Sequence, residues 1–248
     1  MKKYIPNLLT LGNLFCGTVA TIFAVQGDFV GAAIFVVIGI FFDFLDGFAA
    51  RLLKVSGELG KQLDSLADMV TSGVVPGIIM YQLLANNNLN GASFGNSPMN
   101  WMDSEIQFLP LLGLLLTLGS CYRLAKFNID TRQTDLFIGL PTPAMSLFII
   151  SLPLIQEYTS LQFVQDLLTN NYFLLAVTLL LTYLMNAELP LFSLKFKESS
   201  FQKNAVKYLF LITSIVLIIT LKYISIPLII ILYVVLSVIS NFRKQEGV

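Results

Sequence analysis

Long apolar runs separated by short polar breaks follow one another along the chain. A membrane-crossing helix needs about 17 to 25 apolar residues, and in lipid only helices and closed barrels satisfy every backbone polar group. Because the runs have helical rather than strand length, they predict an all-α polytopic membrane protein with about eight transmembrane helices. The predicted helices span residues 6–26, 29–55, 60–85, 107–127, 141–157, 171–188, 205–222 and 225–241.

The polar breaks define how the predicted helices are connected. Gly27-Asp28 predicts a tight turn between the first two helices, and the Asn-, Gly- and Ser-rich stretch Asn86–Glu105 predicts the longest loop. The first apolar run contains Asn7 and Asn13 and continues almost directly into the second, which favours a retained helix over a cleaved signal peptide. We therefore expect a single membrane domain over residues 1–248.

Lysine and arginine residues fall almost entirely on one side of this eight-helix arrangement, with Lys222 on the other side. Basic residues are enriched in cytoplasmic loops of membrane proteins. Both termini, and the turn between the second and third helices, are therefore expected in the cytoplasm. The residues on that side include Lys2, Lys3, Arg51, Lys54, Lys61, Arg123, Lys126, Arg132, Lys195, Lys197, Lys203, Lys207, Arg243 and Lys244.

Composition restricts the chemistry that the chain can carry. Hydrophobic residues make up 56% of the sequence, charged residues only 12%, and the formal net charge is zero, so nothing indicates a nucleic-acid partner. Histidine is absent, which leaves carboxylates, Lys, Tyr or Cys for acid–base work. Cys16 and Cys121 both lie in apolar runs, and we interpret them as small packed side chains rather than a disulfide or zinc site.

Four aspartates stand out in this apolar background. Asp43 and Asp46 share one face of the second predicted helix, and Asp64 and Asp68 share one face of the third. A short turn containing Ser56-Gly57 joins the two helices, so their cytoplasmic ends can bring all four carboxylates together. Solvated charges at helix ends are the plain alternative. They do not account for small and basic residues on the same two faces: Gly47, Ala50, Arg51 and Gly60.

Four carboxylates in a partly desolvated site repel one another unless cations neutralise them. Two divalent ions balance four negative charges, and a site made only of oxygen ligands suits a hard ion such as Mg²⁺ or Mn²⁺. Paired metals are a known device for displacement at phosphorus. The pattern therefore predicts two divalent metal ions held by Asp43, Asp46, Asp64 and Asp68, with the guanidinium of Arg51 suited to phosphate oxygens.

The spacing D-x₂-D-G-x₂-A-R-x₈-G-x₃-D-x₃-D resembles the signature of the CDP-alcohol phosphotransferase family at every fixed position. The resemblance implies cleavage of a CDP pyrophosphate and transfer of a phosphoryl-linked group to an alcohol. It also implies a homodimer and a six-helix catalytic core, here residues 1–190, followed by two additional membrane helices at 205–241.

The family's residue roles transfer onto matching positions of this chain. The resemblance makes all four aspartates metal ligands and Asp68 also the general base, while Gly47 and Arg51 contact the CDP moiety. Three small or hydroxyl residues are expected beside the same donor: Ala50, Ser56 and Gly60. Asn13, near the cytoplasmic start of the first helix, is expected to line the nucleotide site, with interhelical hydrogen bonding as the alternative.

Other segments resemble the membrane-embedded phosphatidylserine synthases of bacteria and archaea: Ile5–Gly17, Leu63–Gly77, Tyr122–Ala144 and Leu184–Lys195. The resemblance implies CDP-diacylglycerol and L-serine as substrates, membrane lipids as surroundings, CMP as leaving group, and a prokaryotic cytoplasmic membrane. Arg123, Lys126 and Asn128 are expected to bind serine, with lipid-headgroup contact as the alternative.

Two other functions remain open at the level of sequence. A sibling enzyme with a glycerol-phosphate or inositol-phosphate acceptor would need a more basic acceptor pocket. An ion-coupled transporter would place carboxylates near mid-membrane in repeated halves. The single cluster at one cytoplasmic turn favours the enzyme.

Overall fold

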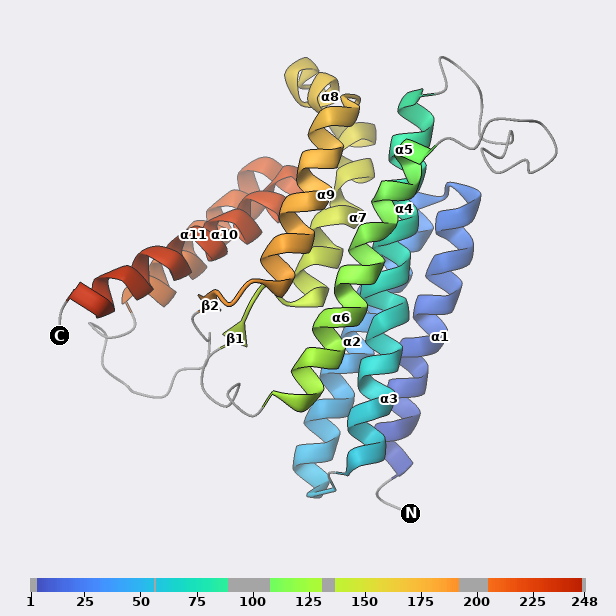
Figure 1. The fold of residues 1–248 in the computed structure, drawn as a ribbon, viewed down its shortest axis with the longest axis vertical. Coiled ribbons are helices and arrows are strands. Elements are labelled where there is room, and N and C mark those ends of the chain that lie inside the picture. Colours follow the sequence, from blue (N-terminus) through green and yellow to red (C-terminus); the bar gives the residue numbers. More distant parts are fainter. Residues whose placement is uncertain (1–3, 56, 89–107, 131–136, 192–204, 247–248) are drawn as a thin grey trace.

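A computed structural model of the protein describes residues 4–55, 57–88, 108–130, 137–191 and 205–246. It is built almost entirely from helices (Figure 1). The first group contains α1 (Tyr4–Gln26), α2 (Phe29–Leu53), α3 (Glu58–Asp68), the π-helical turn η1 (Met69–Val74) and α4 (Val75–Asn88). The second contains α5 (Phe108–Leu111), the 3₁₀ turn η2 (Leu112–Leu114), α6 (Leu115–Ile129), α7 (Thr142–Tyr158), α8 (Gln162–Leu168) and α9 (Asn171–Asn186). The last contains α10 (Ala205–Leu221), the 3₁₀ turn η4 (Lys222–Ile224) and α11 (Ser225–Glu246).

The all-α membrane class is confirmed, and each of the eight predicted segments is helical within a few residues of its expected bounds. The number of spans is smaller by length and apolarity: five stretches qualify, or six if α8 and α9, which meet at 71°, form one broken span. The difference from eight has three sources. Helix α9 has 16 residues and counts only when it is joined to α8. Helix α7 has 17 residues, at the short end of what crosses a bilayer. Val206–Ser240 counts as one apolar stretch.

That last stretch is folded back on itself. The chain turns at η4, where Lys222 has a φ of 48°, and the rings of Phe210 and Tyr233 approach with centroids 5.8 Å apart. Figure 1 shows α10 and α11 as a pair that leans away from the long axis of the other helices. The division into a core at 1–190 and an added pair at 205–241 stays a prediction.

Close contact between α1, α2 and η1 depends on two glycines. A Cβ added to Gly17 of α1 would lie 2.9 Å from the Cα of Thr71, and one added to Gly39 of α2 would lie 2.8 Å from Thr71 Cγ2. Both distances are shorter than real side chains tolerate, so α1, α2 and η1 can meet at Thr71 only because these residues lack side chains. Outside this contact, large apolar side chains such as Phe15, Phe44 and Leu118 are exposed, as expected of a lipid-facing surface.

A very short strand pair fastens the end of α9. Strand β1 (Phe137–Ile138) pairs antiparallel with β2 (Pro190–Leu191), and Leu140 N donates to Leu184 O at 2.9 Å. Gly139 has a φ of 74°, a left-handed conformation that favours glycine. The sequence did not predict this pair, because two-residue strands leave no alternation to detect. It holds the chain after α9 beside the chain before α7.

Candidate functional site

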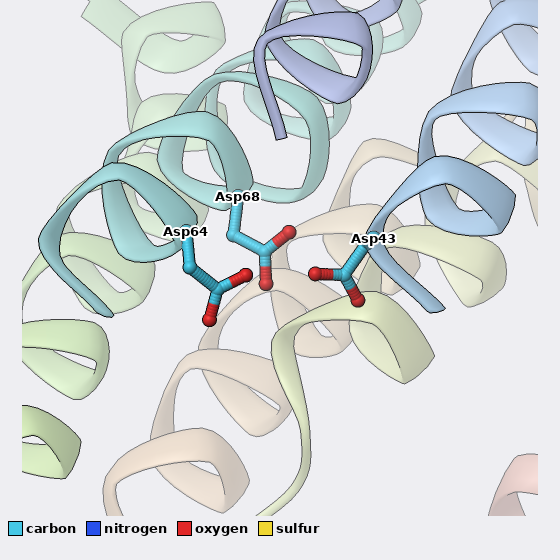
Figure 2. Close-up of side chains that lie close together, drawn as sticks. All are labelled: Asp43, Asp64 and Asp68. Atoms are coloured by element: carbon cyan, nitrogen blue, oxygen red, sulfur yellow. The ribbon is translucent and has the colours of Figure 1, made fainter. Parts of the chain in front are cut away.

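Three of the four predicted metal-ligating aspartates converge. One carboxylate oxygen each from Asp43, Asp64 and Asp68 lies within 4.8 Å of the others. Figure 2 shows the three side chains pointing toward one another, Asp43 from α2 and the other two from α3. Asp64 and Asp68 are one helical turn apart, so both face α2. Helix α2 ends with Lys54 in the left-handed conformation, which reverses the chain and sets α3 alongside.

Asp46 lies outside this group of three. Its side chain is buried, and its Oδ2 accepts a hydrogen bond of 2.5 Å from Thr10 Oγ1 on α1. The same hydroxyl proton is shared with Pro6 O of its own helix, 3.1 Å from Thr10 Oγ1. Helix α1 therefore orients Asp46 beside the three converging carboxylates. Sequence reasoning did not assign Thr10 a role, because a lone threonine in an apolar helix usually bonds its own backbone. A metal-ligand role for Asp46 stays a prediction.

Asn13 is completely buried and makes its contacts inside the protein. Its Nδ2 donates to Asp68 Oδ1 at 3.1 Å, and its Oδ1 accepts from Thr71 Oγ1 at 2.8 Å. Because both ends of the amide are bonded, its orientation is fixed by its partners. These contacts are interhelical hydrogen bonds, the alternative to a nucleotide contact that the sequence left open. Through them, Asn13 positions the side chain of Asp68. Its contact with the donor nucleotide stays a prediction.

The residues expected beside the CDP donor border open space on α2. A Cβ built on Gly47 meets no atom of the described residues within 4 Å, and Arg51 is exposed with its Nε donating to Gly47 O at 3.0 Å. Ala50 is half-buried one residue before Arg51, and a Cβ on Gly60 would make ordinary contact with Asn7 at 3.4 Å. Ser56, the hydroxyl also assigned to the donor, lies outside the described residues.

The three residues expected to bind serine have different surroundings. Arg123 is only 8% exposed, and its Nε has no hydrogen-bond partner among the described residues. Lys126 forms an ion pair of 3.3 Å with Glu188. Asn128 instead joins α6 to α3, since its Oδ1 accepts from Ser65 Oγ at 3.1 Å and its backbone oxygen accepts from Lys61 Nζ. These contacts favour an acceptor-binding role for Arg123 and a structural role for Asn128.

The charge balance of the site is strongly negative. Within the described ranges, no lysine or arginine forms an ion pair with Asp43, Asp64 or Asp68. The charge of buried Arg123 acts on Asp68, but one cation does not balance four carboxylates. An oxygen-only cluster with excess negative charge fits hard divalent cations such as Mg²⁺ or Mn²⁺. The prediction of divalent metals therefore agrees with the donor set.

The helical fold, the aspartate cluster and the sequence signature together indicate one class of membrane protein, and comparison with known sequences identifies it. A model of the CDP-alcohol phosphatidyltransferase family matches residues 3–184, and the chain belongs to that family. The match includes all four aspartates and Arg123. It supports an enzyme rather than the ion-coupled transporter.

Individual relatives agree with this class. A CDP-diacylglycerol–serine O-phosphatidyltransferase of Bacillus subtilis is 36% identical over 155 residues, which cover 60% of this chain and 76% of the relative. A protein of the same name from Helicobacter pylori is 34% identical over 58% of this chain and 55% of the relative. An archaetidylserine synthase of Methanothermobacter thermautotrophicus is 29% identical over 63% of this chain and 60% of its own length. The chain thus spans just over half of some relatives and three quarters of another.

Proposed function

We propose that this chain transfers the phosphatidyl group of CDP-diacylglycerol to the hydroxyl of L-serine and releases CMP. The observation that carries the proposal is the convergence of Asp43, Asp64 and Asp68 in a member of the CDP-alcohol phosphatidyltransferase family. The choice of serine is supported by relatives that are named for serine transfer.

The donor is expected to lie along the exposed face of α2. Gly47 leaves space for the nucleotide to approach the helix backbone, and Arg51 offers a guanidinium to the phosphate oxygens. The acyl chains remain in lipid. Two Mg²⁺ or Mn²⁺ ions, held by Asp43, Asp46, Asp64 and Asp68, would neutralise charge on the pyrophosphate.

The proton moves to Asp68 in this reaction. The serine oxygen forms a bond to the phosphorus that carries diacylglycerol, while the bond from that phosphorus to the CMP oxygen breaks. The hydroxyl proton passes to the Asp68 carboxylate, and CMP leaves with the electron pair. The hydrogen bond from Asn13 keeps one Asp68 oxygen in place, which leaves the other to receive the proton.

Arg123 gives the acceptor a binding group. Its Nε, which has no partner among the described residues, can donate to the serine carboxylate. Because the charges of Arg123 and Asp68 interact, serine bound to Arg123 is expected near the reacting centre. An acceptor bearing a phosphate, as in the sibling enzymes, would need several cations in that place. Lys126 is already paired with Glu188, so the side-chain charges favour a carboxylate over a phosphate.

The surroundings of the enzyme form part of the proposal. We expect a prokaryotic cytoplasmic membrane, the aspartate cluster toward the cytoplasm, and a homodimer, as the family resemblance implies. Figure 1 places the N-terminal end of α1 and the turn between α2 and α3 at the same end of the bundle, which agrees with this orientation.

A direct assay tests the reaction. Purified protein is mixed with CDP-diacylglycerol, Mg²⁺ or Mn²⁺ and labelled serine, and CMP and labelled lipid are measured together. Equal amounts of both products are expected, with little turnover of glycerol phosphate or inositol phosphate. Release of CMP with one of these acceptors but not with serine would overturn the choice of serine and leave the family reaction standing.

A further inference from the structure

A small pocket lies beside Arg123, between α6 and the end of α9. Its walls include Arg123, Lys126, Ile138 and Asn186, and the β1–β2 pair holds the α9 side in position. Helices α6 and α9 come close here because Gly119 has no side chain: a Cβ on it would lie 2.8 Å from Thr182 Cγ2. The pocket is therefore formed by the close packing of α6 against α9.

Asn186 presents an oxygen at this pocket that has no partner within the described part of the chain. Its Nδ2 donates to Thr182 O at 2.9 Å and to Gly119 O at 3.3 Å, whereas its buried Oδ1 accepts no hydrogen bond. Rotating the amide would set its oxygen against two carbonyl oxygens, so this orientation is fixed. Buried acceptors are almost always bonded in native proteins. The Asn186 oxygen thus needs a donor from a ligand or from water.

Arg123 supplies the complementary group in the same pocket. More than nine tenths of the side chain is buried, and its Nε donor is also without a partner. One unpartnered donor with a positive charge and one unpartnered acceptor thus share a single small pocket. A ligand that carries both a carboxylate and an ammonium group satisfies the two together.

Glu188 extends the acceptor side of the pocket. It follows Asn186 by two residues, is 63% exposed, and pairs with pocket residue Lys126 at 3.3 Å. Its carboxylate places a negative charge at the end of α9, two residues after Asn186. Such charge attracts an ammonium group and repels a phosphate dianion.

We propose that Asn186 and Glu188 bind the ammonium group of the acceptor amino acid, while Arg123 binds its carboxylate. This inference rests on the proposed function, because it assumes an amino-acid acceptor. It assigns acceptor specificity to the end of α9. The hydroxyl of the bound amino acid is then expected to reach Asp68.

The test compares two acceptors in wild-type and variant enzymes. L-Serine carries both charged groups, and 3-hydroxypropionate lacks the ammonium. Glu188→Gln is expected to raise the KM for serine about 10-fold, the scale of one hydrogen bond to a charged group, and leave 3-hydroxypropionate unchanged. Asn186→Ala is expected to act in the same direction. Glu157→Gln, the same change at an exposed residue of α7, is the matched control.

A structural role of the Lys126–Glu188 pair would give a different pattern. The double variant Lys126→Glu, Glu188→Lys keeps an ion pair between positions 126 and 188. If the only role of this pair is to stabilise the fold, the double variant should have the KM for serine of the wild-type enzyme. We expect no restoration. Melting temperatures identify any variant that is simply unfolded, and Glu188→Gln, at an exposed side chain, is expected to melt as wild type.

The outcomes separate this inference from the proposed function. A wild-type enzyme that makes no lipid from serine contradicts the proposed function itself. A wild-type enzyme that uses serine, with Glu188→Gln and Asn186→Ala leaving its KM unchanged or changing both acceptors equally, overturns only the ammonium site.

Discussion

Asn13 on α1 donates a hydrogen bond of 3.1 Å to Asp68 at the end of α3. The same amide accepts from Thr71 in the turn that follows, so one buried side chain is bonded to both sides of the junction between α3 and η1. The carboxylate expected to move the proton is thereby oriented by a helix that contributes no member of the acidic cluster.

Replacing Asn13 should lower activity through Asp68. Asn13→Ala removes the donor to Asp68 and the side-chain acceptor of Thr71, which keeps only the Asn13 backbone oxygen at 3.2 Å. We therefore expect kcat to fall about 10-fold to 100-fold. The KM for CDP-diacylglycerol should change little. The free energy of unfolding should also fall by about 1–3 kcal/mol, because buried polar groups lose partners. Thr18→Ala on the exposed face of α1 is the control, and an unchanged kcat in Asn13→Ala would contradict the positioning role.

Asp68→Asn should separate binding from chemistry. The amide keeps the shape of the side chain but cannot take the serine proton, so we expect kcat to fall about 10²-fold to 10⁴-fold. Binding of CDP-diacylglycerol, measured by equilibrium titration, should persist. Asp166→Asn on α8, a helix at the opposite end of the molecule from α3 (Figure 1), is the control for replacing an aspartate by asparagine. Near-normal turnover would mean that another group is the base.

Metal removal should abolish activity and weaken donor binding together. The acidic cluster carries excess negative charge, so chelator should leave carboxylates that repel the pyrophosphate. Asp43→Asn and Asp64→Asn should each require a higher Mg²⁺ or Mn²⁺ concentration for half-maximal activity. Titration of the metal at fixed substrate measures this shift. Full activity in excess chelator would rule out the metal-dependent reaction.

Two glycines of α2 should respond in opposite ways to alanine. Gly39→Ala places a Cβ within 3 Å of Thr71 and Asn13, and we expect a loss of about 1–3 kcal/mol in stability. Gly47→Ala meets no protein atom, so stability should be kept while the KM for CDP-diacylglycerol rises. Thermal melting and donor kinetics of both variants give the comparison. A Gly47→Ala enzyme with an unchanged donor KM would contradict the donor site on α2.

Cysteine labelling should test the orientation in the membrane. In a background of Cys16→Ala and Cys121→Ala, Lys54→Cys lies at the turn after α2 and Gln162→Cys at the start of α8, near opposite ends of the molecule (Figure 1). We expect an impermeant reagent added to intact cells to label only the Gln162 position. Labelling at the Lys54 position instead would reverse the predicted orientation.

The helical part of the fold could be predicted because apolar run length is a strong and local signal. Even the end of α1 at Gln26 and the start of α2 at Phe29 agree with the Gly27-Asp28 turn. The count of spans could not be predicted, because sequence does not show whether a 17-residue helix such as α7 crosses the bilayer. The β1–β2 pair depends on chain segments about fifty residues apart, which no local pattern records.

The charged residues of the candidate site could be predicted from the sequence, because charges are rare in this chain. The hydrogen bonds between helices could not. Asp43, Asp64 and Asp68 stand out in an apolar chain, and regular helix geometry is enough to bring them together. The link from Thr10 to Asp46 crosses from α1 to α2 and depends on the rotation of both helices. Asn128 is a polar residue of a type that often binds ligands. Its hydrogen bond to Ser65 of α3 depends on how α6 packs against α3, which the sequence does not show.

The π-helical turn Met69–Val74 begins directly after Asp68. A turn of this kind corresponds to one inserted residue in an otherwise regular helix, and such insertions are frequent at functional sites. Each residue of an α-helix turns the chain by about 100°. Deleting one residue from Met69–Val74 would therefore re-phase α3 against α4 and rotate the carboxylates away from α2, even though every helix could still form. The half of this span that carries Asp64 and Asp68 and the half formed by α4 are kept in register by a single extra residue.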